Sequence, residues 1–164
     1  MIDFVWVFLL LAVVYQVKHF LADYIFQTDW MLGKFKEVGW VKPLVAHAGV
    51  HAGFTFLIGL AVCPLVLFPY IILAAAFDFT VHFIMDRIKA SPNLMGRWQP
   101  LNGDQFVAMK QVMAGDPIGA PYPVDVARKR LRANKLFWIS LGLDQMVHHL
   151  THYVIIMFFI SLIS

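Results

Sequence analysis

Four long hydrophobic segments divide the chain, and polar stretches or prolines separate them. The segments cover about residues 4–27, 44–62, 65–88 and 136–162. A helix needs about 20 predominantly apolar residues to cross the hydrocarbon core of a bilayer, which is about 30 Å thick. The pattern therefore predicts an all-α polytopic membrane protein, in which residues 1–164 form one domain built on a four-helix transmembrane bundle.

The composition agrees with this class. Hydrophobic residues make up 60% of the chain and charged residues 14%, which is far from the balance of a soluble domain. The only cysteine, Cys63, excludes an internal disulfide and a multi-cysteine zinc site. The first segment lacks a basic leader and a small-residue cleavage site, so we expect it to remain as a span. No nucleic-acid-binding motif is present, and we expect no nucleic-acid partner.

The distribution of basic residues predicts the orientation. Of the 13 lysines and arginines, all but Lys18 lie in or beside the first connection or the long connection of about residues 90–135. Cytoplasmic loops carry the excess of Lys and Arg, so both connections are predicted to be cytoplasmic and both termini extracytoplasmic. Within the long loop, residues 104–114 ("DQFVAMKQVMA") have the pattern of an amphipathic surface helix, although a solvated loop fits them equally well.

Each hydrophobic segment also carries polar side chains four residues apart, which share one helix face. They are Tyr15, His19, Asp23 and Gln27; His47 and His51; Asp78, His82 and Asp86; and Asp144, His148 and His152. An ionisable side chain at membrane depth costs about 2.5–3.5 kcal/mol on insertion scales, so such residues mark a function or a paired network. All four stripes fall in the half of the bilayer nearer the cytoplasm, which predicts one shared polar interior.

Paired imidazoles and carboxylates are ligands with which helical bundles hold metal ions. Zinc accepts His nitrogen and Asp oxygen, and one helix face with two such residues supplies half a site. Asp23, Asp86 and Asp144 bring three negative charges, which two divalent ions would bring close to neutrality. Without metal, we expect these carboxylates to be protonated or paired with charged histidine. We expect Lys18 to reach the interface or to face another helix.

The motifs "KHFLADYIFQ", "HAGVH", "HFIMDRIK" and "GLDQMVHH" cover all four segments. Together they resemble a family of small bacterial inner-membrane proteins that is known only as a domain of unknown function. The resemblance implies an inner-membrane location and no established activity. It implies a core set that consists of His19, Asp23, Gln27, His47, His51, His82, Asp86, Lys89, Asp144, Gln145 and His148, with Asp78, His149 and His152 at its margin.

Within this core set we expect eight metal ligands, two from each helix, which suffice for two zinc or iron ions with about four protein ligands each. They are His19, Asp23, His47, His51, His82, Asp86, Asp144 and His148. Supporting contacts are expected from their neighbours, which are Tyr15, Gln27, Asp78, Gln145, His149 and His152. The alternative is a metal-free hydrogen-bonded network that fixes the helix register.

The leading hypothesis for function is a membrane-embedded metal-dependent hydrolase that acts on a lipid-linked or other amphipathic substrate. A carboxylate that is not bound to metal, from Asp23 or Asp86, would carry the catalytic proton. Arg87 and Lys89 would bind an anionic lipid headgroup, or would only anchor the helix at the interface. The expected partners are membrane lipid and this lipid-linked substrate.

Three alternatives remain open. The first is a di-iron membrane oxidoreductase, because "HHLTH" is similar to the His-rich boxes of membrane desaturases. The second is a proton or metal-ion transporter, although the apolar outer halves of the segments favour an enzyme or sensor over a conduit. The third is a metal-free structural or partner-binding membrane protein. The sequence does not indicate an oligomeric state.

Overall fold

The computed structural model describes residues 4–91, 94 and 134–164. Four helical stretches in these ranges are long and apolar enough to cross a membrane: Phe4–Ile25, Val41–Val62, Leu65–Ala90 and Trp138–Ile163. The prediction of an all-α chain with four membrane-length helices is confirmed for these residues. The predicted surface helix at residues 104–114, and most of the predicted loop of residues 90–135, lie outside the described residues.

The first half of the chain begins with helix α1, which spans Phe4–Phe20 and continues into a π-helical turn, η1, over Leu21–Ile25. A short 3-10 helix, η2 (Met31–Phe35), then leads into α2 (Val41–Val62). The second half begins with another 3-10 helix, η3 (Leu65–Leu67), and α3 (Phe68–Ala90). The last helix is α6 (Asn134–Ile163).

Prolines mark the starts of two helices. Pro43 lies in the first turn of α2, and Pro69 lies in the first turn of α3. A backbone N–H is not needed there for an intrahelical hydrogen bond, so proline is well tolerated. Pro43 can accordingly be part of α2. The helix begins at Val41, a few residues before the predicted start of this hydrophobic segment near residue 44.

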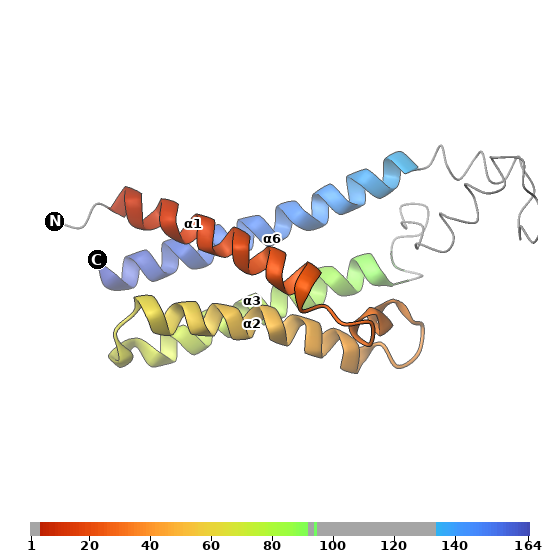
Figure 1. Ribbon diagram of the computed structural model, residues 1–164, viewed down its shortest axis with the longest axis horizontal. Coiled ribbons are helices and arrows are strands. Elements are labelled where there is room, and N and C mark those ends of the chain that lie inside the picture. The colour runs from red at the N-terminus through yellow and green to blue at the C-terminus, as the bar shows by residue number, and fades with distance from the viewer. Residues whose placement is uncertain (1–3, 92–93, 95–133) are drawn as a thin grey trace, which may run out of the picture.

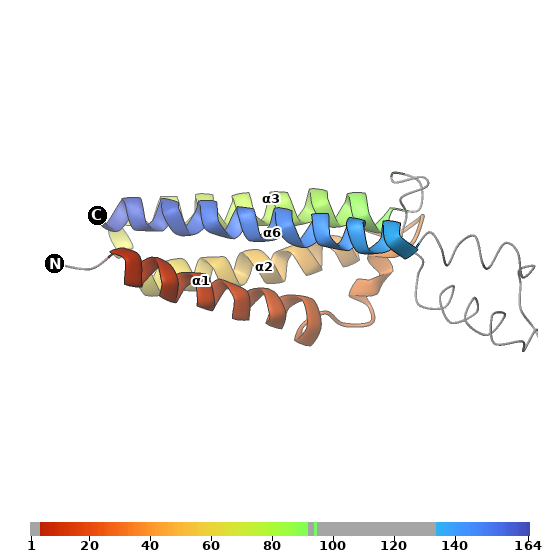
Figure 2. The same cartoon turned by 90° about the horizontal axis from the view of Figure 1, so that it is seen from above.

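The four long helices form a bundle with two distinct ends (Figure 1). The start of α1, the end of α6 and the turn between α2 and α3 lie together at one end, which we call the terminal end. The segment η2, the end of α3 and the start of α6 lie at the other end, which we call the loop end. Figure 2 shows α3 and α6 side by side along one side of the bundle and α1 and α2 along the other.

The interior of the bundle is apolar toward the terminal end and polar toward the loop end. The buried apolar cluster consists of Leu11, Tyr15, Cys63, Ile71, Ala74, Ile155, Ile156, Phe159 and Ile160. Packing is tight at Gly59, where an added methyl group would lie 2.6 Å from Ile71 Cγ2 and 3.0 Å from Phe159 Cζ. Nearer the loop end, His, Asp, Lys and Thr take the buried positions, so the polar stripes face the interior as predicted.

Candidate metal centre

The polar interior is built from one face of each long helix. Helix α2 buries His47, His51 and Thr55 at intervals of four residues, and α3 buries Asp78, His82 and Asp86 in the same way. Because an α-helix turns once in about 3.6 residues, such positions stack along one face. Six of the seven histidines are 4% exposed or less, namely His19, His47, His51, His82, His148 and His152.

A π-helical turn at the end of α1 positions Asp23. The N–H of Phe26 donates a hydrogen bond to the carbonyl of Leu21 at 2.8 Å, which is the five-residue spacing of a π-helix. Asp23 lies within this turn, and its side chain is 15% exposed. The helix ends at Ile25, so Gln27 does not continue the predicted stripe. Single π-helical turns are found frequently at functional sites.

The Asp23 carboxylate is the point at which α1 meets the histidines of α2. His51 Nε2 donates a hydrogen bond to Asp23 Oδ1 at 2.9 Å. His47 Nε2 lies 3.3 Å from the same oxygen, and His19 Nε2 lies 3.2 Å from Oδ2. His47 Nε2 is also 2.9 Å from Asp86 Oδ2, so this imidazole links Asp23 to the carboxylate on α3. One carboxylate thus gathers three imidazoles.

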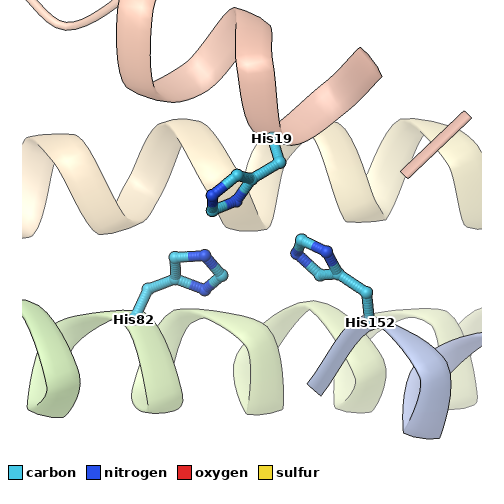
Figure 3. Close-up of side chains that lie close together, drawn as sticks. All are labelled: His19, His82 and His152. Atoms are coloured by element: carbon cyan, nitrogen blue, oxygen red, sulfur yellow. The ribbon is translucent and has the colours of Figure 1, made fainter. Parts of the chain in front are cut away.

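The imidazole rings form one continuous cluster across the bundle. The ring of His82 stacks on those of His51 and His148, with centroids 3.8 Å and 4.1 Å apart. His19 lies 5.4 Å from both His148 and His152, centroid to centroid. Figure 3 shows His19 from α1, His82 from α3 and His152 from α6 pointing into the same space. All four long helices therefore contribute rings to one cluster.

These side chains form groups in which three potential ligand atoms lie within 4.8 Å of one another. Three groups share no residue: Asp23, His47 and His51; Asp86, Asp144 and His148; and His19, His82 and His152. A fourth, formed by His19, Asp23 and His148, overlaps with all of them. The groups contain all eight residues that the sequence suggested as ligands, and His152 in addition. Their role as ligands stays a prediction.

His19 and His82 have the arrangement that suits a metal ligand. His19 Nε2 donates to Gln145 Oε1 at 2.9 Å, and His82 Nδ1 donates to the Asp78 carbonyl at 3.0 Å. His19 Nδ1 and His82 Nε2 are buried and make no hydrogen bond within the described part of the chain. A ring fixed through one nitrogen, with the other free to bind, is the usual state of a metal-binding histidine. The donor set of nitrogens and carboxylate oxygens fits zinc or ferrous iron.

His148 is fully buried, and neither of its ring nitrogens has a hydrogen-bond partner among the described residues. Its Nε2 lies 4.0 Å from Asp144 Oδ1, which is also buried without such a partner. Buried polar groups in proteins are nearly always hydrogen-bonded or bound to an ion or water. His148 and Asp144 are therefore the side chains in the cluster that a metal ion would satisfy best.

His152 differs from the other buried histidines because it contacts a lysine. Lys18 Nζ donates to His152 Nε2 at 3.1 Å and to Asp78 Oδ2 at 2.7 Å. An ammonium group has only donors, so His152 Nε2 accepts and the proton of the neutral ring lies on Nδ1. This leaves no free lone pair on the ring. The contact favours His152 as a supporting residue, although it lies close to His19 and His82.

Three lysines balance the buried carboxylates. Besides the Lys18–Asp78 pair, Lys34 Nζ lies 3.0 Å from Asp86 Oδ2, and Lys89 Nζ lies 2.7 Å from Asp144 Oδ2. The expectation that metal, protonation or charged histidine would have to neutralise Asp86 and Asp144 was wrong, because lysines pair with both. Lys18 faces α3 and α6, and it does not reach the interface, because its side chain is 1% exposed. Asp23 is the one buried-cluster carboxylate here that has only imidazole partners among the described residues.

The lysines also change the charge balance. Lys18, Lys34 and Lys89 bring three positive charges against four negative ones from Asp23, Asp78, Asp86 and Asp144, which leaves −1 with neutral histidines. One divalent ion would change this to +1 and two would change it to +3. The expectation that two divalent ions would bring the centre close to neutrality was therefore wrong, because it left out the three lysines.

The residues that the sequence suggested as supports are mostly at the cluster. Gln145 contacts His19 and also donates to Asp144 Oδ2 at 3.2 Å. Gln16 Nε2 contacts His149 Nδ1 at 3.2 Å on the partly exposed side of α6. The Tyr15 ring lies 5.1 Å from that of His152. Asp78 anchors Lys18 and His82, whereas Gln27 makes no hydrogen bond with the cluster in the part of the chain that is described.

Arg87 and Lys89, which were predicted to bind a lipid headgroup, lie in different surroundings. The Arg87 guanidinium stacks on the Trp40 ring, 3.7 Å from its centroid. Lys89 is turned inward, toward Asp144 and Asp86, and its side chain is 20% exposed. Lys89 therefore belongs to the buried cluster in this structure, and Arg87 lies beside it at the loop end.

Sequence reasoning missed Lys34 and Thr55. Thr55 Oγ1 donates to Asp78 Oδ2 at 2.7 Å, and its place four residues after His51 was a signal that could have identified it. Lys34 belongs to η2, which folds back against α2 where Gly33 approaches Pro43; an added methyl group there would lie 3.0 Å from Pro43 Cγ. No helical spacing predicts that contact.

The Lys18–Asp78 pair yields a prediction about stability. Replacing Lys18 with Met leaves Asp78 buried without its cation, and removal of one partner of a buried pair costs about 3–5 kcal/mol. The double variant K18M/D78N should recover much of this loss. Unfolding in detergent measures both effects, and K36M, at an exposed lysine, is the matched control. A K18M variant as stable as K36M would contradict the importance of the pair.

No protein-family model, curated protein or solved structure matches the chain. The resemblance to membrane proteins of unknown function that the four motifs indicate therefore stays a prediction. The activity of the protein has to be inferred from its own side chains.

Proposed function

We propose that this chain is a multi-pass protein of the bacterial inner membrane, and that its polar interior is a metal centre that hydrolyses a lipid-linked or other amphipathic substrate. The observation that carries the proposal is the convergence of His and Asp side chains from four membrane-length helices into three ligand groups that share no residue. Burying so many ionisable groups at membrane depth is costly, so a function is the expected reason for their presence.

The centre would hold two zinc or iron ions. The two groups that contain carboxylates, Asp23 with His47 and His51, and Asp86 with Asp144 and His148, are the better positions because a carboxylate offsets the charge of the ion. His19 and His82 would complete the ligand sets, each through its nitrogen without a hydrogen bond among the described residues. A bound metal ion would polarise the substrate and activate water for attack on an ester or phosphoester.

Asp23 is the better of the two proposed proton carriers. Its side chain is 15% exposed, whereas that of Asp86 is 2% exposed and is held by Lys34 and His47. A general base must exchange protons with water or substrate, so the accessible carboxylate suits the task. The two oxygens of Asp23 also face different partners, with Oδ1 toward His47 and His51 and Oδ2 toward His19.

The apolar end of the bundle supports an enzyme over a transporter. Leu11, Ile71, Ile155 and Phe159 are each 3% exposed or less and fill the interior toward the terminal end. An ion or proton that crosses the membrane needs polar groups along its whole path, and the described residues in this part of the interior offer almost none. The proposed orientation, with both termini extracytoplasmic, places the polar centre on the cytoplasmic side.

A metal-free network is the second candidate, because the lysine–carboxylate pairs already neutralise most of the buried charge. The test uses the full chain in detergent micelles with fluorogenic ester and phosphoester lipids. The proposal predicts hydrolysis that a chelator abolishes and that added zinc or ferrous iron restores. Absence of hydrolysis by metal-loaded protein would contradict the enzymatic function, and absence of bound metal would favour the network.

A further inference from the structure

We propose that the loop end of the centre binds a phosphate monoester group, such as that of a lipid headgroup, through Lys34 and Lys89. This inference rests on the proposed metal centre, and it names the chemical class of its substrate. The two lysines come from different parts of the chain, η2 and the end of α3, and converge on neighbouring carboxylates.

Lys34 and Lys89 are both paired with carboxylates of a single ligand group. Lys34 Nζ donates to Asp86 Oδ2 at 3.0 Å, and Lys89 Nζ donates to Asp144 Oδ2 at 2.7 Å and lies 3.8 Å from Asp86 Oδ1. Asp86 and Asp144 form that group with His148. A metal ion in this group would bind the same two carboxylates, and Asp144 Oδ1 is available to it because this oxygen has no hydrogen-bond partner among the described residues. The ion and the two ammonium groups would then share the negative charge of the carboxylates.

Metal binding would therefore leave the two ammonium groups only partly neutralised. Lys34 is 3% exposed, so its ammonium group cannot replace the contact with Asp86 by contacts with bulk water unless it moves out of the bundle. A buried cation without a partner is strongly unfavourable, so an anion from the substrate would restore the pairing. Lys18 behaves differently, because Asp78 is in none of the ligand groups and the Lys18–Asp78 pair stays intact.

The charge balance selects a phosphate monoester among common lipid groups. The four carboxylates and three lysines sum to −1, and two divalent ions raise the sum to +3. A phosphate monoester dianion lowers the sum to +1, whereas a carboxylate or a phosphodiester lowers it only to +2. Lysine ammonium groups are common phosphate ligands, since they act as compact point charges.

The position of these lysines suits a headgroup that enters from the membrane surface. Lys89 is the more accessible of the two, with 20% of its side chain exposed, and Lys34 lies in η2 at the loop end. Arg87 adds a third cation at this end. Its guanidinium stacks on Trp40, and its buried Nη1 makes no hydrogen bond within the described residues. A phosphate bound at Lys89 would lie near this guanidinium, because Arg87 and Lys89 both belong to the last turn of α3.

The test measures phosphate binding by the full chain in phosphatidylcholine nanodiscs, with the metal content determined on the same samples. Inorganic phosphate and phosphatidic acid are the two probes, because the same chemistry can come from a free anion or from a lipid. Metal-loaded wild-type protein should bind at least one of them, and metal-depleted protein should bind both at least tenfold more weakly. Binding of phosphatidic acid alone would identify a lipid headgroup as the source.

The variants K34M and K89M should each weaken binding about tenfold or more, as expected for a lost hydrogen bond between charged groups. Both should keep their metal, because each removes a cation that competes for the ligand carboxylates. K36M and K42M, at exposed lysines near η2, are matched controls and should bind like the wild type. K34R and K89R should retain binding within a few-fold, which separates loss of charge from loss of fold.

Two results would overturn the proposal in distinguishable ways. A metal-loaded protein that binds neither probe, or that binds equally well in K34M, K89M and K36M, would overturn the phosphate site and leave the metal centre standing. A folded protein that binds no metal would overturn the metal centre and this inference with it.

Discussion

Replacing His148 with alanine is expected to lower metal affinity by at least ~10–100-fold, whereas the same change at His149 should have little effect. The lower bound is the loss typical of residues that only support a ligand, and a ligand itself should matter more. His148 is fully buried, belongs to two of the ligand groups and has no hydrogen bond at either ring nitrogen among the described residues. His149 is partly exposed and contacts Gln16 instead.

The two variants differ by one position on the same helix, so each controls for the effect of losing an imidazole from α6. Metal is titrated into chelator-treated, monodisperse protein, and the affinity follows from competition with an indicator dye. D144A should resemble H148A, and H152A should lose less, because Lys18 occupies His152 Nε2. Equal retention of metal in D144A, H148A and H149A would exclude this helix from the metal site. Loss in H152A alone would place the centre deeper in the membrane.

Replacing Asp23 with asparagine is expected to reduce hydrolysis by about 100–10,000-fold, the range attributed to a general acid or base. The change keeps the shape of the side chain and removes the charge that His19, His47 and His51 now share. An amide also donates hydrogen bonds, and it presents only one oxygen to the imidazoles that the two carboxylate oxygens now contact. The effect should therefore appear in the rate and also in metal binding at this end of the centre.

Asp29 provides the matched control, since its carboxylate is exposed in the short segment between η1 and η2 and a D29N variant loses the same charge. Hydrolysis of a fluorogenic lipid ester is measured at saturating metal concentration, so that a lower affinity for metal is not mistaken for a slower chemical step. D29N should hydrolyse at the wild-type rate. A D23N protein that keeps its metal and matches D29N in rate would show that Asp23 is not the proton carrier, and Asp86 would then have to be tested.

Helical periodicity and hydropathy predicted the parts of the molecule that depend on local sequence. His47 and His51, or His82 and Asp86, share a face in any α-helix, so their common burial followed from spacing alone. The span boundaries followed from the length of each apolar segment. They shifted by a few residues at α2, which begins at Val41 with Pro43 in its first turn. These features need no knowledge of how the helices pack together.

The features that spacing did not predict depend on deviations from a regular helix or on loop geometry. The π-helical turn at Leu21–Ile25 ends the stripe before Gln27. The prediction included Gln27 because it assumed a regular 3.6-residue repeat throughout the segment. Lys34 reaches Asp86 only because η2 folds back against the start of α2. Lysine has a long, flexible side chain, so the partners of Lys18 and Lys89 also depend on packing that the sequence alone does not define.

The central claim, that the polar interior is a metal centre, is tested most directly by the metal content of wild-type protein purified in detergent without chelators. Elemental analysis of the monodisperse fraction should give about two equivalents of zinc or iron per chain, as the two carboxylate-containing ligand groups predict. Folded protein that contains no metal, and that takes up none when zinc or ferrous iron is added, would contradict the claim. The lysine–carboxylate pairs would then be the reason that these groups are buried.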